Sequence, residues 1–193
     1  LEIDPDSDFS MQNFPFGVFS VKEQGTRRCA TRLGDTVIDL SVLEECGMFE
    51  FSNIFHQPTL NAFLEMSPSV WNAVRQQLVD LFRKKDDGGV STLSDNPILQ
   101  QAAFYSINQV HLHLPIAIGD YTDFYSSREH AENVGQMFRN SKELNPNWTS
   151  LPVAYHGRAS TVFVSGREIV RPSGQLGADS FGKSQQLDFE LEV

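Results

Sequence analysis

Three short strand-like segments follow one another near the start of the chain, and turn signals separate them. They cover residues 17–21, 28–32 and 36–39, with Gly25 and the pair Gly34–Asp35 between them. Short strands joined by glycine turns usually pair with their neighbours in sequence. The pattern therefore predicts a small antiparallel meander, so the first part of the fold is expected to be built on β structure.

Four helices are predicted after the meander, over residues 40–45, 60–65, 68–84 and 97–103. The longest follows Ser67, which we expect to cap it. Its apolar residues recur every three or four positions: Val70, Trp71, Val74, Leu78, Leu81 and Phe82. That spacing marks one buried helix face. We interpret the stripe as core and expect a first module of residues 1–114.

Composition limits the classes of function. The 193 residues include 15 Phe and carry a formal charge of −10, which repels nucleic acid and anionic lipid surfaces. The apolar runs are shorter than the ~20 residues of a membrane span. Only two cysteines occur, Cys29 and Cys46, in no metal-binding spacing. We therefore expect a soluble cytoplasmic protein with neither nucleic-acid nor membrane partners.

A second module, residues 115–193, is predicted to become β-rich towards its end. Residues 161–166 and 168–171 resemble a hairpin about Gly166, and residues 172–183 a loop rich in Gly, Ser and Pro. Residues 187–193 alternate apolar and acidic side chains, as a strand does. The chain starts without Met and stops on this strand pattern, so we expect a piece of a longer protein.

The most polar part of the second module is residues 119–139. Aliphatic residues are sparse there, while carboxylates, phenols, guanidiniums and His130 are concentrated. These groups offer a metal ligand, a base and anion-binding side chains. A polar surface loop leading into a helix is the alternative interpretation.

Three carboxylates, Asp188, Glu190 and Glu192, share one face of the last predicted strand. Either this face is in solvent, or a cation holds the carboxylates ionised. Oxygen ligands select a hard ion such as Mg²⁺ or Ca²⁺. Asp123 is the candidate fourth group, with Tyr125 on its face if that segment is extended. His111 and His113 also share a face, but without a third ligand we interpret them as a half-exposed strand.

Several segments carry a resemblance to a known family. Residues 119–139, 146–148, 151–153, 155–160 and 187–192 closely resemble the fumarylacetoacetase (fumarylacetoacetate hydrolase) family, and residues 16–20 and 53–61 do so more weakly. The resemblance implies a mainly β fold with some α structure. The implied fold comprises an SH3-like small β-barrel with helices over residues 1–114, followed by the beginning of a β-rich catalytic domain over residues 115–193.

The resemblance also implies roles for particular residues. Asp123, Glu190 and Glu192 match carboxylates that bind Ca²⁺ or Mg²⁺, whereas Asp188 matches no ligand. His130 matches the general base. Tyr125, Arg139 and Tyr155 match substrate contacts. In that family a fourth metal carboxylate and a catalytic lysine lie beyond the position of Val193.

The implied reaction is hydrolysis of a carbon–carbon bond in a small β-diketo acid, 4-fumarylacetoacetate, by a cytoplasmic homodimer in tyrosine and phenylalanine breakdown. Two other interpretations stay open. One is a related acylpyruvate hydrolase or decarboxylase on the same catalytic fold. The other is a metal-binding β module without activity, which acts through protein contacts.

Overall fold

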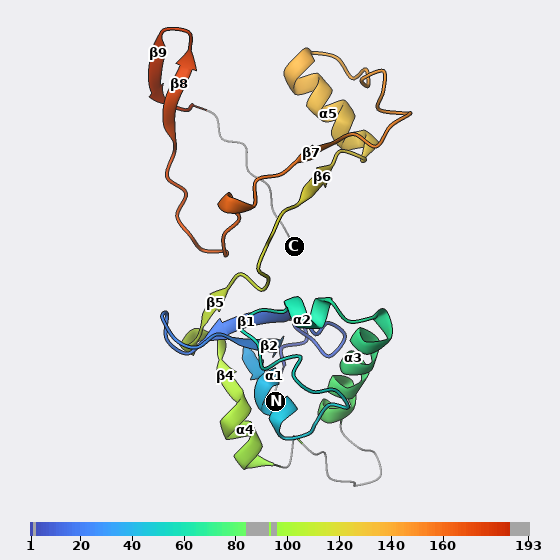
Figure 1. Cartoon of the computed structure of the whole chain (residues 1–193), viewed down its shortest axis with the longest axis vertical. Coiled ribbons are helices and arrows are strands. Elements are labelled where there is room, and N and C mark those ends of the chain that lie inside the picture. Colours follow the sequence, from blue (N-terminus) through green and yellow to red (C-terminus); the bar gives the residue numbers. More distant parts are fainter. Residues whose placement is uncertain (2, 84–92, 94–95, 186–193) are drawn as a thin grey trace. The chain divides into compact units, whose positions relative to one another are not determined.

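The computed structural model describes residues 1, 3–83, 93 and 96–185. Five strands of the first part form one curled antiparallel sheet in the order β4–β3–β2–β1–β5 (Figure 1). Their bounds are β1 Phe16–Ser20, β2 Arg28–Leu33, β3 Thr36–Asp39, β4 Phe104–Ser106 and β5 His111–His113. The predicted meander is confirmed as β1–β2–β3. Strands β4 and β5 add the two edges of the sheet. The half-exposed strand interpreted at His111 and His113 is confirmed as β5, whereas β4 was not predicted.

The four predicted helices are present as α1 Leu40–Glu45, α2 Asn61–Leu64, α3 Pro68–Phe82 and α4 Pro97–Ala103. In α3 the predicted stripe is buried at Val74, Leu78 and Leu81. Ser67 occupies the N-cap of α3 as predicted, and its carbonyl accepts the N–H of Val70 at 2.9 Å. The Ser67 hydroxyl lies 2.7 Å from the hydroxyl of Ser69 and makes no capping hydrogen bond.

Helix α1 begins at Leu40 because the preceding residue caps it. Asp39 is fully buried, and its Oδ1 accepts hydrogen bonds from the backbone N–H of Ser41 at 3.0 Å and from the Ser41 hydroxyl at 2.6 Å. Its Oδ2 accepts a hydrogen bond from Arg28 at 2.7 Å. A buried carboxylate is stable only when its oxygens are paired in this way.

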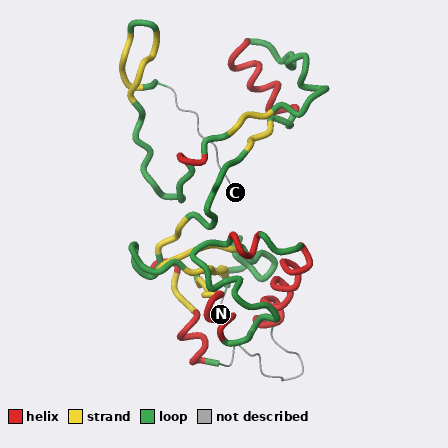
Figure 2. Tube along the Cα trace, in the orientation of Figure 1, coloured by secondary structure: helices red, strands yellow, loops and turns green. Residues whose placement is uncertain are grey.

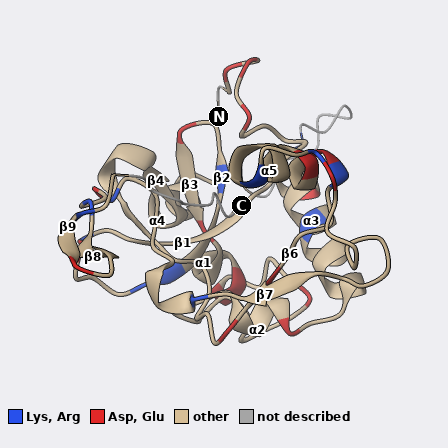
Figure 3. Cartoon of the chain, turned by 90° about the horizontal axis from the view of Figure 1, so that it is seen from above, with Lys and Arg blue, Asp and Glu red and all other residues tan. Residues whose placement is uncertain are grey.

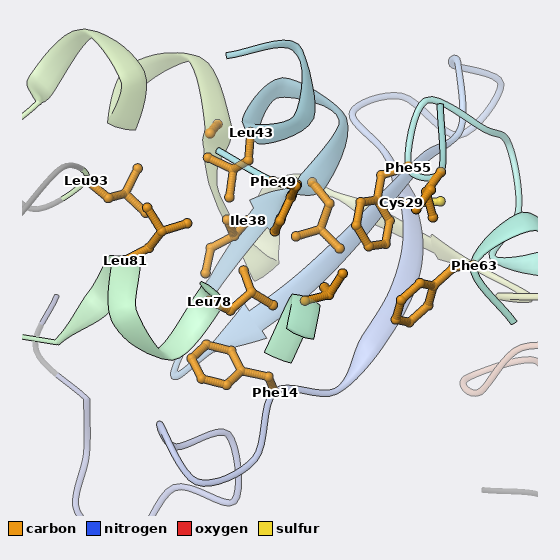
Figure 4. Close-up of a cluster of buried hydrophobic side chains, with 14 of the residues drawn as sticks. Phe14, Cys29, Ile38, Leu43, Phe49, Phe55, Phe63, Leu78, Leu81 and Leu93 are labelled. Carbon is orange, nitrogen blue, oxygen red and sulfur yellow. The ribbon is translucent and has the colours of Figure 1, made fainter. Parts of the chain in front are cut away.

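The main core is formed by the sheet together with side chains of helices α1, α2, α3 and α4 (Figure 4). Aromatic rings form much of it. Phe55 lies 5.2 Å from Phe49 and 5.1 Å from Phe63 between ring centroids, and both pairs are tilted. Burial of such side chains contributes most of the stabilisation of a domain of this size.

Both cysteines are free thiols. Cys29 is fully buried in β2 and its Sγ lies 3.4 Å from the carbonyl oxygens of Gln57 and Thr59. Burial raises the pKa of the Cys29 thiol to about 12. Cys46 is exposed at the end of α1.

The chain leaves the first part through residues 115–117, which are hydrogen-bonded to the start of α2. The N–H of Leu60 donates to the carbonyl of Pro115 at 2.8 Å. Contacts divide the chain into two units, Leu1–Val162 and Phe163–Val193. The predicted boundary after residue 114 stays a prediction.

Short elements separated by loops make up residues 118–185 (Figure 2). They are β6 Thr122–Phe124, α5 Arg128–Arg139, β7 Ala154–His156, β8 Ser173–Gly177 and β9 Ser180–Lys183, with a 3₁₀ turn at Ala159–Thr161. No helix of the described residues is long and apolar enough to cross a membrane.

The predicted hairpin of residues 161–171 is wrong, as is the predicted loop of residues 172–183. Gly166 does turn the chain, with φ +90°, but its flanking residues are not strands. The hairpin is instead β8–β9, joined through Ala178 and Asp179 with an irregular register between Gln175 and Gly177. β propensity alone misplaced it, because a strand also needs a paired neighbour. The predicted strand 187–193 lies outside the described residues.

Candidate functional site

A two-stranded ribbon made of β6 and β7 carries the first predicted site residues. The register pairs Thr122 with His156, Asp123 with Tyr155 and Phe124 with Ala154. The ladder continues at both ends. The N–H of Tyr125 donates to the carbonyl of Val153 at 2.9 Å, and the N–H of Gly157 donates to the carbonyl of Tyr121 at 3.0 Å.

Asp123 and Tyr155 are therefore direct cross-strand partners on one face of the ribbon. Asp123 is half-buried, whereas Tyr155 is 51% exposed. Because side chains alternate along a strand, Tyr121 and Tyr125 share the face of Asp123. The structure thus brings a predicted metal ligand and a predicted substrate contact together from positions 32 residues apart.

Tyr125 connects the ribbon to helix α5. Its ring meets the imidazole of His130 edge-on, with ring centroids 5.8 Å apart at an interplanar angle of 81°. Its hydroxyl donates to the carbonyl of Ala131 at 3.4 Å. The indole N–H of Trp148 donates to the carbonyl of Tyr125 at 2.8 Å. The predicted base and one predicted substrate contact are therefore neighbours.

Helix α5 positions His130 and Arg139. Ser127 caps the helix by accepting a hydrogen bond from the N–H of His130 at 3.3 Å, and Asn140 ends it in the left-handed conformation with φ +54°. Ala131 and Gly135 are the buried residues of the helix. His130 lies in the first turn and is exposed.

Arg139 lies at the other end of α5. Arg139 follows His130 by nine positions, which amounts to roughly 13 Å of axial rise and about half a turn of rotation. Its guanidinium donates to the carbonyl of Glu143 at 3.0 Å. The helix thus does not bring Arg139 next to His130.

Charged residues of both signs lie on α5 (Figure 3). Arg128 donates to Glu132 one helical turn later at 2.8 Å, and this hydrogen bond raises the pKa of the exposed Arg128 guanidinium. Exposed pairs of this kind contribute little to stability. Arg128 and Glu132 therefore form a solvated helix surface near His130.

The predicted metal ligands are only partly within the described residues. Asp123 is described, whereas Glu190 and Glu192 lie outside the described ranges. Among the residues that the structure describes, no three His, Cys, Asp or Glu side chains form a group that could hold a metal ion. Asp123 supplies a carboxylate, the donor type that Ca²⁺ and Mg²⁺ prefer, so this residue fits such an ion.

Two contacts on the ribbon were missed by the sequence reasoning. Asp120 Oδ1 lies 2.7 Å from Nε2 of His156, and the ring of Tyr121 covers Gly157. Both depend on the register of β6 and β7. The only sequence signal for them was that Asp120 and Tyr121 precede one extended segment while His156 and Gly157 end another.

The two histidines of β5 differ in their surroundings. His113 Nε2 lies 2.7 Å from the hydroxyl of buried Ser20, and burial lowers the pKa of His113, with smaller effects from Arg27 and His111. His111 is exposed. His113 thus has a structural partner in β1.

Comparison with known proteins gives matches along the whole chain. The family described as Fumarylacetoacetase N-terminal matches residues 12–115. The chain is 41% identical to a fumarylacetoacetase of Arabidopsis thaliana over 204 residues, covering 100% of this chain and 48% of the relative. A Rattus norvegicus fumarylacetoacetase is 42% identical and the Homo sapiens protein 41%, each over 203 residues and with the same coverage.

The chain thus spans about half the length of the curated relatives that it matches. The family match covers more than half of the chain and includes all five strands of the first sheet. The identity with the relatives extends through the β6–β7 ribbon and α5. The chain belongs to the fumarylacetoacetase family, of which it carries the amino-terminal domain.

Proposed function

We propose that this chain is part of a metal-dependent hydrolase that converts 4-fumarylacetoacetate and water to fumarate and acetoacetate. The observation that carries the proposal is 41% identity to a protein named fumarylacetoacetase along 100% of the chain. The pairing of Asp123 with Tyr155 supports it, because a metal ligand must lie close to a substrate contact for both to act on one molecule.

In the proposed architecture, residues 1–114 form an SH3-like small β-barrel with helices and residues 115–193 begin the β-rich catalytic domain. The curled five-stranded sheet and the family match at residues 12–115 support this division. A cytoplasmic homodimer is the proposed assembly.

His130 is the proposed general base. It takes a proton from water while the water oxygen bonds to the carbonyl carbon that becomes a carboxyl carbon of fumarate. The bond from that carbon to the acetoacetate carbon then breaks. Its electron pair leaves as the enolate of acetoacetate, which takes up a proton. The ring of Tyr125, in edge contact with His130, limits the orientations of the imidazole.

Substrate binding is assigned to Tyr125, Tyr155 and Arg139. The phenol groups donate hydrogen bonds to substrate oxygens, and the guanidinium binds a substrate carboxylate. Asp123 would hold a Ca²⁺ or Mg²⁺ ion together with Glu190 and Glu192. Such an ion, when bound, supplies positive charge that stabilises the enolate leaving group.

The test uses the polypeptide encoded by the complete gene and follows the consumption of 4-fumarylacetoacetate. His130→Ala is compared with His111→Ala, which removes another exposed histidine, on β5. We expect His130→Ala to lower kcat by roughly 10²- to 10⁴-fold, as the loss of a general base does. The His111→Ala variant keeps the parental rate. Near-normal hydrolysis by His130→Ala with metal bound contradicts the role of His130.

Calorimetric titration with Mg²⁺ and with Ca²⁺ tests the metal site in the same protein. A stoichiometric site that Asp123→Asn abolishes is the expected result, with Asp179→Asn, in the β8–β9 turn, as the matched control. Binding of the ion without turnover favours the non-catalytic metal-binding module instead. Turnover of acylpyruvates but not of 4-fumarylacetoacetate favours the related hydrolase.

A further inference from the structure

The β6–β7 ribbon is too short to define its own register. Each strand has three residues, and an isolated two-stranded ribbon is marginally stable. A slip of one residue would move Asp123 to the opposite face from Tyr155, because side chains alternate along a strand. The geometry of the proposed site therefore depends on contacts that select one register.

One such contact lies on the face of the ribbon from which Asp123 projects. Gly157 is buried beneath the ring of Tyr121, and a Cβ added to Gly157 would lie 2.2 Å from two ring carbons of Tyr121. Atoms cannot approach that closely. In this register only glycine fits opposite Tyr121, whereas a slip of one residue would place the side chain of His156 or Arg158 against the ring.

A second contact lies on the opposite face. His156 Nε2 and Asp120 Oδ1 are 2.7 Å apart, and the same oxygen accepts the N–H of Tyr121 at 3.0 Å. His156 is the cross-strand partner of Thr122, so the pair with Asp120 is diagonal across the ribbon. In a slipped register His156 would project from the other face and leave Asp120.

From these two contacts, we propose that Tyr121 with Gly157, and Asp120 with His156, are positioning residues that set the register in which Asp123 faces Tyr155. The inference rests on the proposed function for the roles of Asp123 and Tyr155. The register itself is a property of the ribbon, measurable without metal or substrate.

A cross-strand disulfide measures this register. Phe124 and Ala154 are partners in a pair without mutual hydrogen bonds, where the Cα atoms lie about 4.5 Å apart, within the range of a disulfide. Phe124→Cys and Ala154→Cys are introduced together with Cys46→Ser, which removes the exposed native thiol. The rate of disulfide formation in a glutathione buffer is followed by mass spectrometry.

Gly157→Ala is expected to slow disulfide formation about tenfold, which corresponds to about 1.4 kcal/mol. Adding Tyr121→Ala to Gly157→Ala should restore the rate, because the ring that the new methyl group meets is gone. Gly119→Ala is the matched control, since a Cβ there meets no atom within 4 Å. A Gly157→Ala chain that cross-links at the parental rate overturns the role of Tyr121 with Gly157.

The contact between Asp120 and His156 is tested by substitutions at the exposed His156 side chain. His156→Leu removes the partner of Asp120, whereas His156→Gln keeps an N–H donor. We expect the leucine variant to cross-link more slowly and the glutamine variant to match the parent. His56→Leu, which disrupts another exposed histidine–carboxylate pair, with Glu45 at 3.1 Å, is the control. Equal rates for all three variants overturn the role of Asp120 with His156.

Failure of this inference and failure of the proposed function give different results. If the cross-linking rates follow the expected pattern but the complete protein binds neither Mg²⁺ nor Ca²⁺, the register contacts stand and the metal site does not. If metal binds and turnover occurs while all variants cross-link at equal rates, the proposed function is supported and the positioning roles of these two contacts are rejected.

Discussion

The side-chain amide of Asn61 exchanges two hydrogen bonds with the backbone of Ala117. Its Nδ2 donates to the carbonyl of Ala117 at 3.2 Å, and its Oδ1 accepts the N–H of Ala117 at 2.8 Å. Asn61 is the first residue of α2 and lies 56 positions from Ala117. This exchange imitates a strand pair and joins the segment that leaves the first sheet to α2.

Removal of this amide should release Ala117. We expect Asn61→Ala to speed hydrogen exchange at the Ala117 N–H roughly tenfold, the effect of losing about 1.4 kcal/mol of local hydrogen bonding. Asn61→Asp keeps an acceptor for that N–H and should preserve most of its protection. Asn72→Ala, at an exposed position of α3, is the control. Unchanged exchange in Asn61→Ala would show that Leu60 and Pro115 hold the segment alone.

The carboxylate of Glu44 binds three consecutive backbone N–H groups. Those of Ile54, Phe55 and His56 donate to it at distances of 2.7 to 3.2 Å. We expect Glu44→Ala to lower the free energy of unfolding by about 3 kcal/mol, because the amides of buried Ile54 and Phe55 lose a charged acceptor.

Urea unfolding measures this effect. Formate at high concentration should recover part of the loss, since it can occupy the same three N–H groups. Glu45→Ala is the neighbouring control, at a side chain that is 61% exposed, and should change stability by about 0.5 kcal/mol or less. Equal destabilisation by both variants would refute the assigned role of Glu44.

The buried ion pair of Asp39 with Arg28 gives a third prediction. Asp39→Asn places an amide N–H₂ against either the Arg28 guanidinium or the α1 N–H groups, so donors face donors. We expect it to destabilise the fold by about 3 kcal/mol or more in urea unfolding. Asp35→Asn alters an exposed pair with Arg32 and should cost less than about 1 kcal/mol. If Asp39→Asn left the free energy of unfolding unchanged, the hydrogen bonds of the Asp39 carboxylate would be replaceable by those of an amide.

The two thiols should differ sharply in reactivity. With a pKa of about 12, Cys29 is a thiolate in roughly one molecule of ten thousand at pH 8, and it is also buried. We expect a thiol reagent such as dithiobisnitrobenzoate to modify one group per folded chain and two in denaturant. In Cys46→Ser the fast reaction should disappear. Rapid modification of two thiols in the folded chain would contradict the burial of Cys29.

The Cys29 thiol makes the free energy of unfolding depend on pH in the alkaline range. Burial raises the pKa of Cys29 from 9.0 to about 12, so the folded state keeps a proton that the unfolded state loses. Its contribution is fully present below pH 9 and is lost as pH rises towards 12, at about 1.4 kcal/mol per pH unit. Cys29→Ala should therefore show a shallower decline in unfolding free energy than the parent over this window. Parallel declines would show that the thiol titrates normally.

Local signals in the sequence explain which parts of the fold were predictable. Helix α1 was predicted with its observed bounds, and the structure shows that Asp39 caps it. Strand β4 was not predicted, and β5 was interpreted as a half-exposed strand without its place in the sheet. Both strands exist as sheet edges because β3 and β1 pair with them.

The hairpin errors have the same cause. The β-branched and aromatic residues at 161–164 favour extended backbone, but no strand pairs with them among the described residues, whereas Gln175 and Phe181 do pair. Propensity describes one residue at a time, and pairing depends on two segments.

For the site, the amino-acid sequence by itself determined the chemistry on offer: Asp123, Tyr125 and His130 in one polar segment, and a family resemblance that gave them roles. Only the tertiary structure decided that Asp123 faces Tyr155, that Tyr125 contacts His130, and that Arg139 lies at the far end of α5 from His130. The physical reason is that residue type follows from local composition, whereas register is set by contacts between distant segments, here Tyr121 with Gly157 and Asp120 with His156.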